Sequence, residues 1–115
     1  IDDTNVRGTT SKALIKLIRS AKPKQLHLKI TSPQIKFPCF YGMDFPSREE
    51  LIANDYNSEE EIGKALGVDS LHYLTIEKLL AAVPKDEGIG YCTACFTGEY
   101  PVEYDKNQNK FSTEE

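Results

Sequence analysis

Two adjacent carboxylates, Asp2 and Asp3, are the first side chains in this sequence that could do chemistry. Paired carboxylates can accept hydrogen bonds from the two hydroxyls of a ribose, or bind a hard cation such as Mg²⁺. About one helical turn later the chain offers a glycine, three hydroxyls and the expected start of a helix, in the residues Arg7, Gly8, Thr9, Thr10 and Ser11.

The start of a helix binds phosphate, because its first N–H groups are unpaired and carry partial positive charge. A glycine there lets the backbone approach a ligand closely. The opening stretch IDDTNVRGTT therefore indicates a site for a phosphorylated sugar. A polar turn before an ordinary capped helix, with Thr9, Thr10 or Ser11 as the N-cap, has the same residue types and stays open at this point.

Three cysteines, Cys39, Cys92 and Cys95, form a second candidate site. Their odd number, without a secretory signal, argues against a disulfide framework. Cys92 and Cys95 have the C-x-x-C spacing that lets two thiolates reach one metal centre. Plain structural thiols, zinc, an iron–sulfur centre and a redox pair all remain open. His27 and His72 could complete a metal site, although His27 reads as an outward, solvated residue of a strand.

The elements that position these residues follow from hydrophobic spacing. An apolar stripe at helical period predicts a helix over residues 11–22, ended by Pro23, with Leu14, Leu17, Ile18 and Ala21 on its apolar side. Residues 25–32 alternate apolar and polar, which predicts a half-buried strand. A helix that leads into such a strand indicates part of a βαβ unit and hence a parallel sheet.

Further along, the prolines and apolar residues of 32–46 predict an ordered loop, and short helices follow it. Ser47 with Glu50, and Ser58 with Glu61, have the spacing of capping boxes, and Gly67 is a left-handed helix stop. Residues 70–75 predict a short strand. Residues 76–83 predict an amphipathic helix with one apolar side, formed by Ile76, Leu79, Leu80 and Val83.

The composition is that of an ordinary globular domain, with 39% hydrophobic and 28% charged residues in a chain of 115. A net charge of −4 argues against a surface that coats nucleic acid, which needs a basic face. No apolar run approaches the length of a membrane span. We therefore expect no nucleic-acid partner, no membrane partner and a cytoplasmic location.

Larger stretches of the chain resemble one family. IDDTNVRGTTSK is similar to the phosphoribosyl-pyrophosphate (PRPP) signature of type I phosphoribosyltransferases. PCFYGMDFPSREELIA, SLHYLTIEKLLAAV and YCTACFTGEYPV together resemble the C-terminal part of amidophosphoribosyltransferases, glutamine-dependent enzymes that make 5-phosphoribosylamine in the first committed step of purine synthesis. The resemblance covers nearly all of the chain except its polar end.

The resemblance implies roles for the opening residues. Asp2 and Asp3 would contact the ribose hydroxyls and the Mg²⁺–PRPP complex. The loop around the 5′-phosphate would comprise Val6, Arg7, Gly8, Thr9 and Thr10, with Ser11 beside it. Asn5 departs from the family, which usually has an apolar β-branched residue there, but this departure removes no expected ligand group.

The resemblance also implies a cofactor. One branch of the family carries a structural [4Fe–4S] cluster on four cysteines, and Cys39, Cys92 and Cys95 match three of them. The fourth would come from far upstream in the family and has no counterpart in this sequence. Further implied partners are purine nucleotides as feedback ligands, the family's N-terminal glutaminase domain and further copies in a homo-oligomer.

The implied fold is α/β: part of a type I phosphoribosyltransferase, with a Rossmann-like parallel sheet and a C-terminal helical segment that contains cysteines. We expect residues 1–102 to form this part, with the PRPP loop, helix and strand in 1–31 and the helical, cluster-binding segment in 32–102. Residues 103–115 are expected to be a disordered polar tail. Since the glutaminase part and most of the sheet are missing, we expect a C-terminal fragment that is inactive alone.

Two other functions remain open from the residues. One is a small interaction domain with zinc on Cys39, Cys92, Cys95 and a histidine, which would make Asp2 and Asp3 turn residues. The other is a module that binds PRPP or a nucleotide and catalyses nothing.

Overall fold

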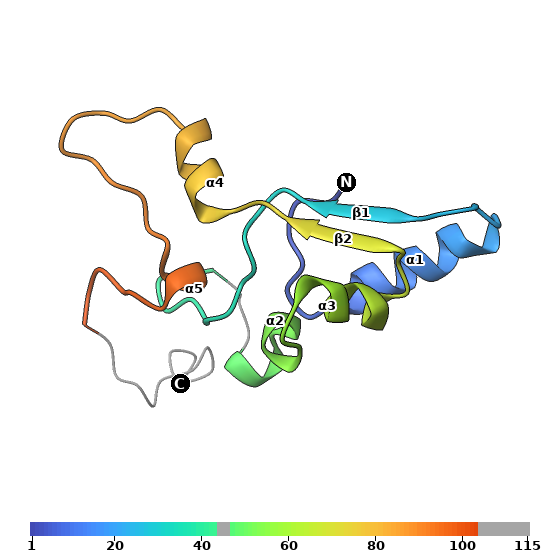
Figure 1. Cartoon of the computed structure of the whole chain (residues 1–115). Helices are drawn as coiled ribbons and strands as arrows, with labels where there is room; N and C mark the ends of the chain where they lie inside the picture. The colour runs from blue at the N-terminus through green and yellow to red at the C-terminus, as the bar shows by residue number, and fades with distance from the viewer. Residues whose placement is uncertain (44–46, 104–115) are drawn as a thin grey trace.

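The structure, a computed structural model, describes residues 1–43 and 47–103 (Figure 1). Residues 104–115 of the predicted tail lie outside the described part. The helices and strands in chain order are α1 (Thr9–Ser20), β1 (His27–Ile30), the 3₁₀ helix η1 (Arg48–Glu50), α2 (Ile52–Asp55), α3 (Glu59–Leu66), β2 (Ser70–Tyr73), α4 (Ile76–Ala82) and α5 (Ala94–Thr97). None of the described helices is both long and apolar enough to cross a membrane.

The two strands form a parallel sheet, as predicted. His27 pairs with Ser70 at one end of the ladder, and Ile30 pairs with Tyr73 at the other. Asp2 adds a parallel bridge to Ile30 on the opposite edge of β1, where the Asp2 N–H donates to the Lys29 carbonyl at 2.9 Å. The sheet therefore fixes the backbone of Asp2, the first of the two adjacent carboxylate residues.

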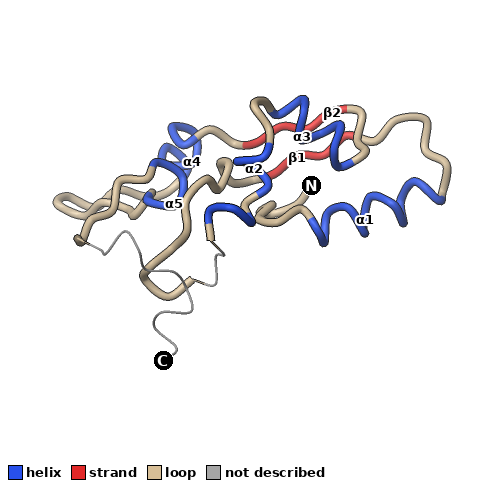
Figure 2. Tube along the Cα trace, turned by 90° about the horizontal axis from the view of Figure 1, so that it is seen from below, coloured by secondary structure: helices blue, strands red, loops and turns tan. Residues whose placement is uncertain are grey.

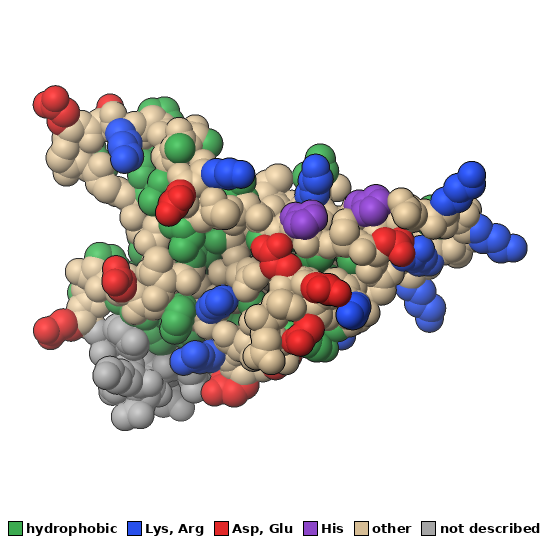
Figure 3. All heavy atoms as spheres, in the orientation of Figure 1, with side chains coloured by type: hydrophobic (Ala, Val, Ile, Leu, Met, Phe, Trp, Pro, Cys, Tyr) green, Lys and Arg blue, Asp and Glu red, His purple; other side chains and the backbone are tan. Residues whose placement is uncertain are grey.

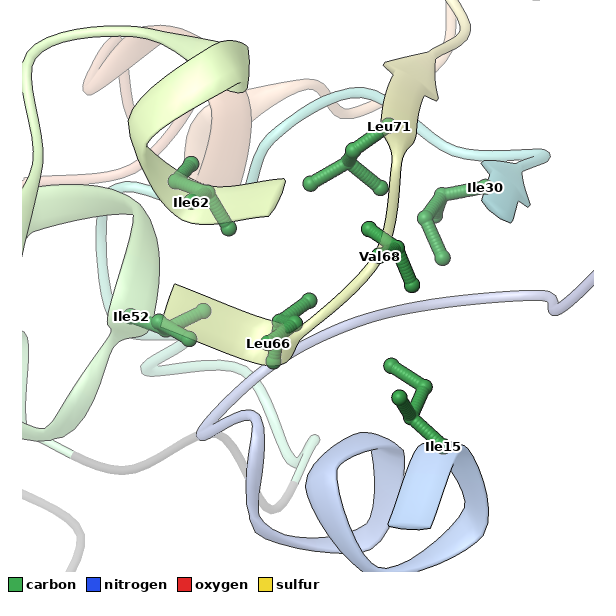
Figure 4. Close-up of a cluster of buried hydrophobic side chains, with 7 residues drawn as sticks. All are labelled: Ile15, Ile30, Ile52, Ile62, Leu66, Val68 and Leu71. Carbon is green, nitrogen blue, oxygen red and sulfur yellow. The ribbon is translucent and has the colours of Figure 1, made fainter. Parts of the chain in front are cut away.

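The core lies on one face of this sheet. Helices α1 and α3 both lie on that side of the strands (Figures 1 and 2). Inward residues alternate along each strand, as the period of two requires. Side chains from the strands, from α1, α2 and α3 and from the turn after α3 converge in one cluster (Figure 4): Ile15, Ile30, Ile52, Ile62, Leu66, Val68 and Leu71.

The apolar side predicted for α1 is not the side that is buried, so this part of the prediction is wrong. The buried residues of the helix are Ser11 and Ile15, whereas Leu14 and Leu17 are 45% and 69% exposed. Two four-residue strands are narrow, so they and α3 cover one stripe of the helix and leave the neighbouring stripe open. Apolar spacing identified the helix correctly, but it did not determine which of two adjacent stripes meets the core.

Helix α4 forms where it was predicted, but none of its residues is buried. Its apolar side chains Ile76, Leu79 and Leu80 are half-exposed, and so is Val83 directly after the helix. The helix lies beyond the carboxyl end of β2, away from α1 and α3 (Figures 1 and 2). The outer face of the sheet is polar and exposed, with histidine and lysine side chains on the visible surface over the strands (Figure 3).

The two predicted capping boxes have different outcomes. Ser58 caps α3, because its Oγ accepts the Glu61 N–H at 3.2 Å; the Glu61 carboxylate accepts the N–H of Asn57, one residue earlier than in the standard box. Gly67 ends the helix in the left-handed conformation, as predicted, with φ 88°. The box at Ser47 is wrong: its side chain caps no backbone N–H, since η1 is a single 3₁₀ turn.

Replacing Ser58 with alanine should therefore destabilise the chain by about 1 kcal/mol, the usual value of an N-cap hydrogen bond. The measurement is urea unfolding followed by far-ultraviolet circular dichroism. Ser47→Ala is the matched control, because it deletes a hydroxyl at a helix start without removing a cap. Equal losses in the two variants would contradict the assignment.

Arg19 and Asp69 join the end of α1 to the turn before β2. The Arg19 guanidinium donates to the Gly67 carbonyl and, at 2.9 Å, to the Asp69 carboxylate. That carboxylate also accepts the Leu26 N–H at 2.7 Å. The Leu26 N–H and then Arg19 hold the pKa of Asp69 below its ordinary value of 3.8.

This lowered pKa predicts a pH dependence of stability. A carboxylate whose folded pKa lies below its unfolded value contributes stability that is complete above the unfolded pKa of about 3.9. That contribution is lost as the pH falls through the folded pKa. Asp69→Asn should therefore flatten the loss of stability between roughly pH 5 and pH 2, measured by urea unfolding across that range. An unchanged slope, equal to that of the exposed-loop control Glu87→Gln, would contradict this role.

Candidate functional site

The opening loop lies at the carboxyl ends of both strands, where open α/β sheets place their ligands. Asp2 pairs with Ile30, the last residue of β1, and the side chain of Asn5 reaches Tyr73, the last residue of β2. A cavity of about 350 Å³ lies over this loop and is lined by ten consecutive residues, 2–11. The sequence-predicted residues of the opening motif therefore come together in one cavity.

The two carboxylates are arranged as a tight polar turn. Asp2 Oδ1 accepts the Asp3 N–H at 2.9 Å, and Asp3 Oδ1 accepts the Thr4 N–H at 2.7 Å. Asp3 is exposed and Asp2 is half-buried. Mg²⁺ in phosphate sites is commonly held by one or two carboxylates together with substrate oxygens. This donor pair fits that mode of binding, and among the described residues no three His, Cys, Asp or Glu side chains are grouped to hold a metal by themselves.

The start of α1 provides the complementary half of the cavity. Gly8 is the N-cap, with φ 78°, so neither the threonines nor Ser11 has that role. No side chain caps the helix and no acidic residue stands in its first turn. The first N–H groups of an α-helix have no partner inside the helix. The N–H groups beside the exposed Thr9 and Thr10 therefore remain suited to an anion.

Gly8 is required by its surroundings as well as by its backbone angle. A Cβ at this position would lie 2.4 Å from Cδ1 of Ile52, a core residue of α2. The loop is seated on the same helix by a hydrogen bond from the Ile52 N–H to the Val6 carbonyl at 2.9 Å. Arg7 forms a long, exposed ion pair with Glu50 at 3.9 Å, which contributes little to stability.

A buried polar network supports the loop from below, and the sequence analysis did not identify it. Asn5 is only 3% exposed, and its Nδ2 donates to the Tyr73 hydroxyl at 3.1 Å. Its Oδ1 accepts the hydroxyl of Ser11 at 3.2 Å, so this hydroxyl is directed at Asn5. Burial raises the pKa of Tyr73 above its ordinary value. The one signal in the sequence was a polar residue where the resembled family has an apolar one.

The cysteines come from two segments that lie side by side although they are far apart in sequence (Figure 1). The N–H groups of Lys36 and Phe37 both donate to the Cys95 carbonyl on α5, at 3.0 and 3.1 Å. The Tyr100 hydroxyl donates to the Pro38 carbonyl at 2.6 Å. These bonds hold the loop that carries Cys39 against α5.

All three thiols are free of disulfides. Burial raises the pKa of the Cys95 thiol, and the nearby Cys39 and Cys92 raise it further. Among the described residues, however, the three cysteines are not grouped closely enough to hold a metal ion. Phe40 and Tyr41 pack on Tyr100, with ring centroids 5.2 and 6.0 Å apart, as expected for aromatic packing.

Proteins similar in sequence to this chain include amidophosphoribosyltransferases from several organisms. The chain is 48% identical over 103 residues to an amidophosphoribosyltransferase of Methanocaldococcus jannaschii, and 46% identical over 110 residues to one of Drosophila melanogaster. These matches cover 90% and 88% of the chain but only 21% and 20% of the two relatives. No family model matches.

Solved structures give the same result for the fold. The glutamine PRPP amidotransferase of Bacillus subtilis, in complex with ADP and GMP, superposes with a TM-score of 0.77 at 44% identity. A structure described as the allosteric regulatory enzyme of purine biosynthesis superposes with a TM-score of 0.81 at 42% identity. The chain covers 23% of each of those chains. The predicted α/β arrangement is therefore confirmed.

Proposed function

Because the chain belongs to the amidophosphoribosyltransferase family, we propose that residues 2–11 bind the ribose 5-phosphate part of PRPP. The chain spans about a fifth of the length of the relatives it matches. The observation that carries this proposal is one cavity with carboxylates at one end and an uncapped helix start at the other. Carboxylates suit the ribose hydroxyls, and free N–H groups suit the phosphate.

In this proposal each part of the loop has one task. Asp2 and Asp3 accept hydrogen bonds from the ribose hydroxyls and provide the protein ligands for Mg²⁺. The N–H groups at the start of α1 hold the 5′-phosphate, and Gly8 allows the backbone to approach it. Bound Mg²⁺ supplies positive charge that stabilises the pyrophosphate leaving group. The contribution of this chain is positioning, and it requires no acid or base among these residues.

The reaction of the whole enzyme enters the proposal through the family. Ammonia released from glutamine would displace pyrophosphate from C1 of PRPP and give 5-phosphoribosylamine. We propose that this chain supplies the sugar-phosphate half of that site and does not turn over by itself. Purine nucleotides share the ribose 5-phosphate group, so they are expected as further ligands of the same loop. The three free cysteines suit a reducing compartment such as the cytoplasm.

Isothermal titration calorimetry of the chain tests this binding. Ribose 5-phosphate should bind at least about 10-fold more tightly than ribose or inorganic phosphate alone, because its two halves are linked and engage both ends of the cavity. If ribose 5-phosphate bound no more tightly than either half, the two ends would not form one site.

A [4Fe–4S] cluster on Cys39, Cys92 and Cys95 is a second part of the proposal. The support is that the three cysteines are free and that the loop carrying Cys39 is hydrogen-bonded to α5, which carries Cys95. Such a cluster takes four ligands, so Cys39, Cys92 and Cys95 would provide three, and the fourth would be a group other than these three thiols. The cluster would have a structural role, fixing α5 against the loop that carries Cys39.

Iron, zinc and acid-labile sulfide, measured per chain after anaerobic purification, test the cluster. Iron and sulfide in near-equal amounts would support it. Zinc without sulfide would favour a zinc-binding interaction domain, and Cys95→Ser should then abolish the zinc as well. The absence of all three would contradict a cluster held by this chain.

A further inference from the structure

We propose that Asn5 is a positioning residue, which fixes the phosphate-binding loop to the end of β2 through the hydroxyl of Tyr73. This inference rests on the proposed function of residues 2–11. It assigns a task to a side chain that would touch no part of the sugar phosphate.

Both the nitrogen and the oxygen of the Asn5 side-chain amide are hydrogen-bonded. Its buried amide donates to Tyr73 Oη at 3.1 Å and accepts from Ser11 Oγ at 3.2 Å. Buried polar groups are costly unless they are paired, so this bridge forms only in one arrangement of the loop. In that arrangement the middle of the loop, the start of α1 and the end of β2 are joined through a single side chain.

The bridge that Asn5 forms to Tyr73 and Ser11 lies between the two halves of the cavity. The loop leaves the sheet at Asp2 and enters the helix after Gly8. Asn5 stands between these points in the chain and bonds Ser11, in the first turn of α1. A ligand that engages the carboxylates and the helix start at once needs a fixed spacing between them. Asn5 sets that spacing, because it ties the start of α1 to Tyr73 at the end of β2, while Asp2 is bridged to Ile30, the residue of β1 that pairs with Tyr73.

Tyr73, whose hydroxyl accepts the Asn5 amide, is itself fixed by the fold. The Tyr73 N–H donates to Glu59 Oε1 at 3.3 Å, and Glu59 is the first residue of α3. The Tyr73 ring packs against the core cluster. The hydroxyl that receives Asn5 is therefore attached to the rigid part of the fold. A loop released from it would populate the competent arrangement for only a fraction of the time, and the apparent Kd would rise by the reciprocal of that fraction.

Tyr73→Phe tests the inference, because it removes one hydroxyl and keeps the ring. Tyr56→Phe is the matched control: Tyr56 is also half-buried and packs against the same core cluster. Two readouts are compared, the Kd for ribose 5-phosphate by NMR titration and the amide hydrogen exchange of residues 5–10 without ligand. Tyr73→Phe should raise both the Kd and the loop exchange rates about 5- to 10-fold, and Tyr56→Phe should change each less than twofold.

A double-mutant cycle shows whether Asn5 acts through Tyr73. Asn5→Val alone should weaken ribose 5-phosphate binding as Tyr73→Phe does, and adding it to Tyr73→Phe should cost less than a further twofold. Multiplying effects would overturn the inference, since a residue with only a local structural role has no reason to lose its effect in that background. Unchanged Kd and loop exchange in Tyr73→Phe, even with lower unfolding stability, would also overturn it.

The two proposals fail in different ways. If the unmodified chain does not bind ribose 5-phosphate, the proposed function is wrong. Hydrogen exchange in the ligand-free chain still decides the role of the anchor. Equal loop exchange in the two tyrosine variants would then show that Asn5 does not hold the loop through Tyr73.

Discussion

Replacing Gly8 with alanine is expected to abolish detectable ribose 5-phosphate binding and to destabilise the chain by about 2 to 4 kcal/mol. Two physical effects add at this position. A residue with a Cβ loses roughly 1 to 2 kcal/mol in the left-handed conformation that Gly8 adopts at φ 78°. The new methyl would also lie 2.4 Å from Cδ1 of Ile52, which is buried and has little room to move. Relief of this contact shifts the loop away from α2 and with it the first N–H groups of α1.

Gly88→Ala is the control for the backbone effect. Gly88 also has a positive φ, 80°, but nothing lies within 4 Å of where its Cβ would be. This variant should therefore show at most about 1 to 2 kcal/mol of destabilisation and no change in ligand affinity. Thermal unfolding and calorimetric titration measure the two quantities. If Gly8→Ala bound ribose 5-phosphate as the unmodified chain does, the start of α1 would not be the phosphate site.

The paired variant Asp2→Asn/Asp3→Asn should weaken Mg²⁺–PRPP binding by roughly 100-fold, because it removes both carboxylates offered to the metal. Asparagine Oδ1 can still accept the N–H groups of Asp3 and Thr4, so the turn should keep its shape. Ribose 5-phosphate without Mg²⁺ should respond differently. Its dianionic phosphate is repelled by these carboxylates, so its affinity should fall much less or rise slightly.

The different responses of the two ligands distinguish a metal-binding pair from two turn residues. The control is Asp86→Asn/Glu87→Gln, which removes the same two charges from an exposed loop elsewhere in the chain. It should leave both affinities within about twofold, since screening by salt weakens charge effects over longer distances. An equal loss of both ligands in the Asp2/Asp3 variant would contradict the assignment of these carboxylates to Mg²⁺.

Much of the fold could be predicted because it depends on local spacing. The period of two predicted the strand that became β1, residues 70–75 were expected to form the strand that became β2, and the helical period predicted α1 and α4. Ser58 and Gly67 act at the ends of α3 as their residue types indicate. The buried stripe of α1 could not be predicted, because Ile15 and the exposed Leu17 are equally apolar, and only the position of α3 decides between them.

The residues of the candidate site also fall into two groups: those that the sequence indicates and those that only the tertiary structure shows. Residues with ligand-like groups, such as Asp3 and Gly8, are candidates from type and spacing, although a polar turn before a capped helix has the same residue types. Supporting residues are not: Ile52 meets the loop only after the chain has passed through β1, and Tyr73 only after it has also passed through α2 and α3. Asn5 is unusual in the sequence because the resembled family has an apolar residue there. Its hydrogen-bond partners lie 6 and 68 residues away, so its role can be inferred only from the tertiary structure.

The most direct test of the account is an NMR chemical-shift map of the ¹⁵N-labelled chain titrated with ribose 5-phosphate, then with Mg²⁺–PRPP. We predict that the largest shifts fall on the backbone amides of residues 2–11 and saturate at a single Kd. The amide signals around Cys95 on α5 should not move. Shifts concentrated outside residues 2–11, or none at saturating ligand, would contradict the claim that this loop binds the sugar phosphate.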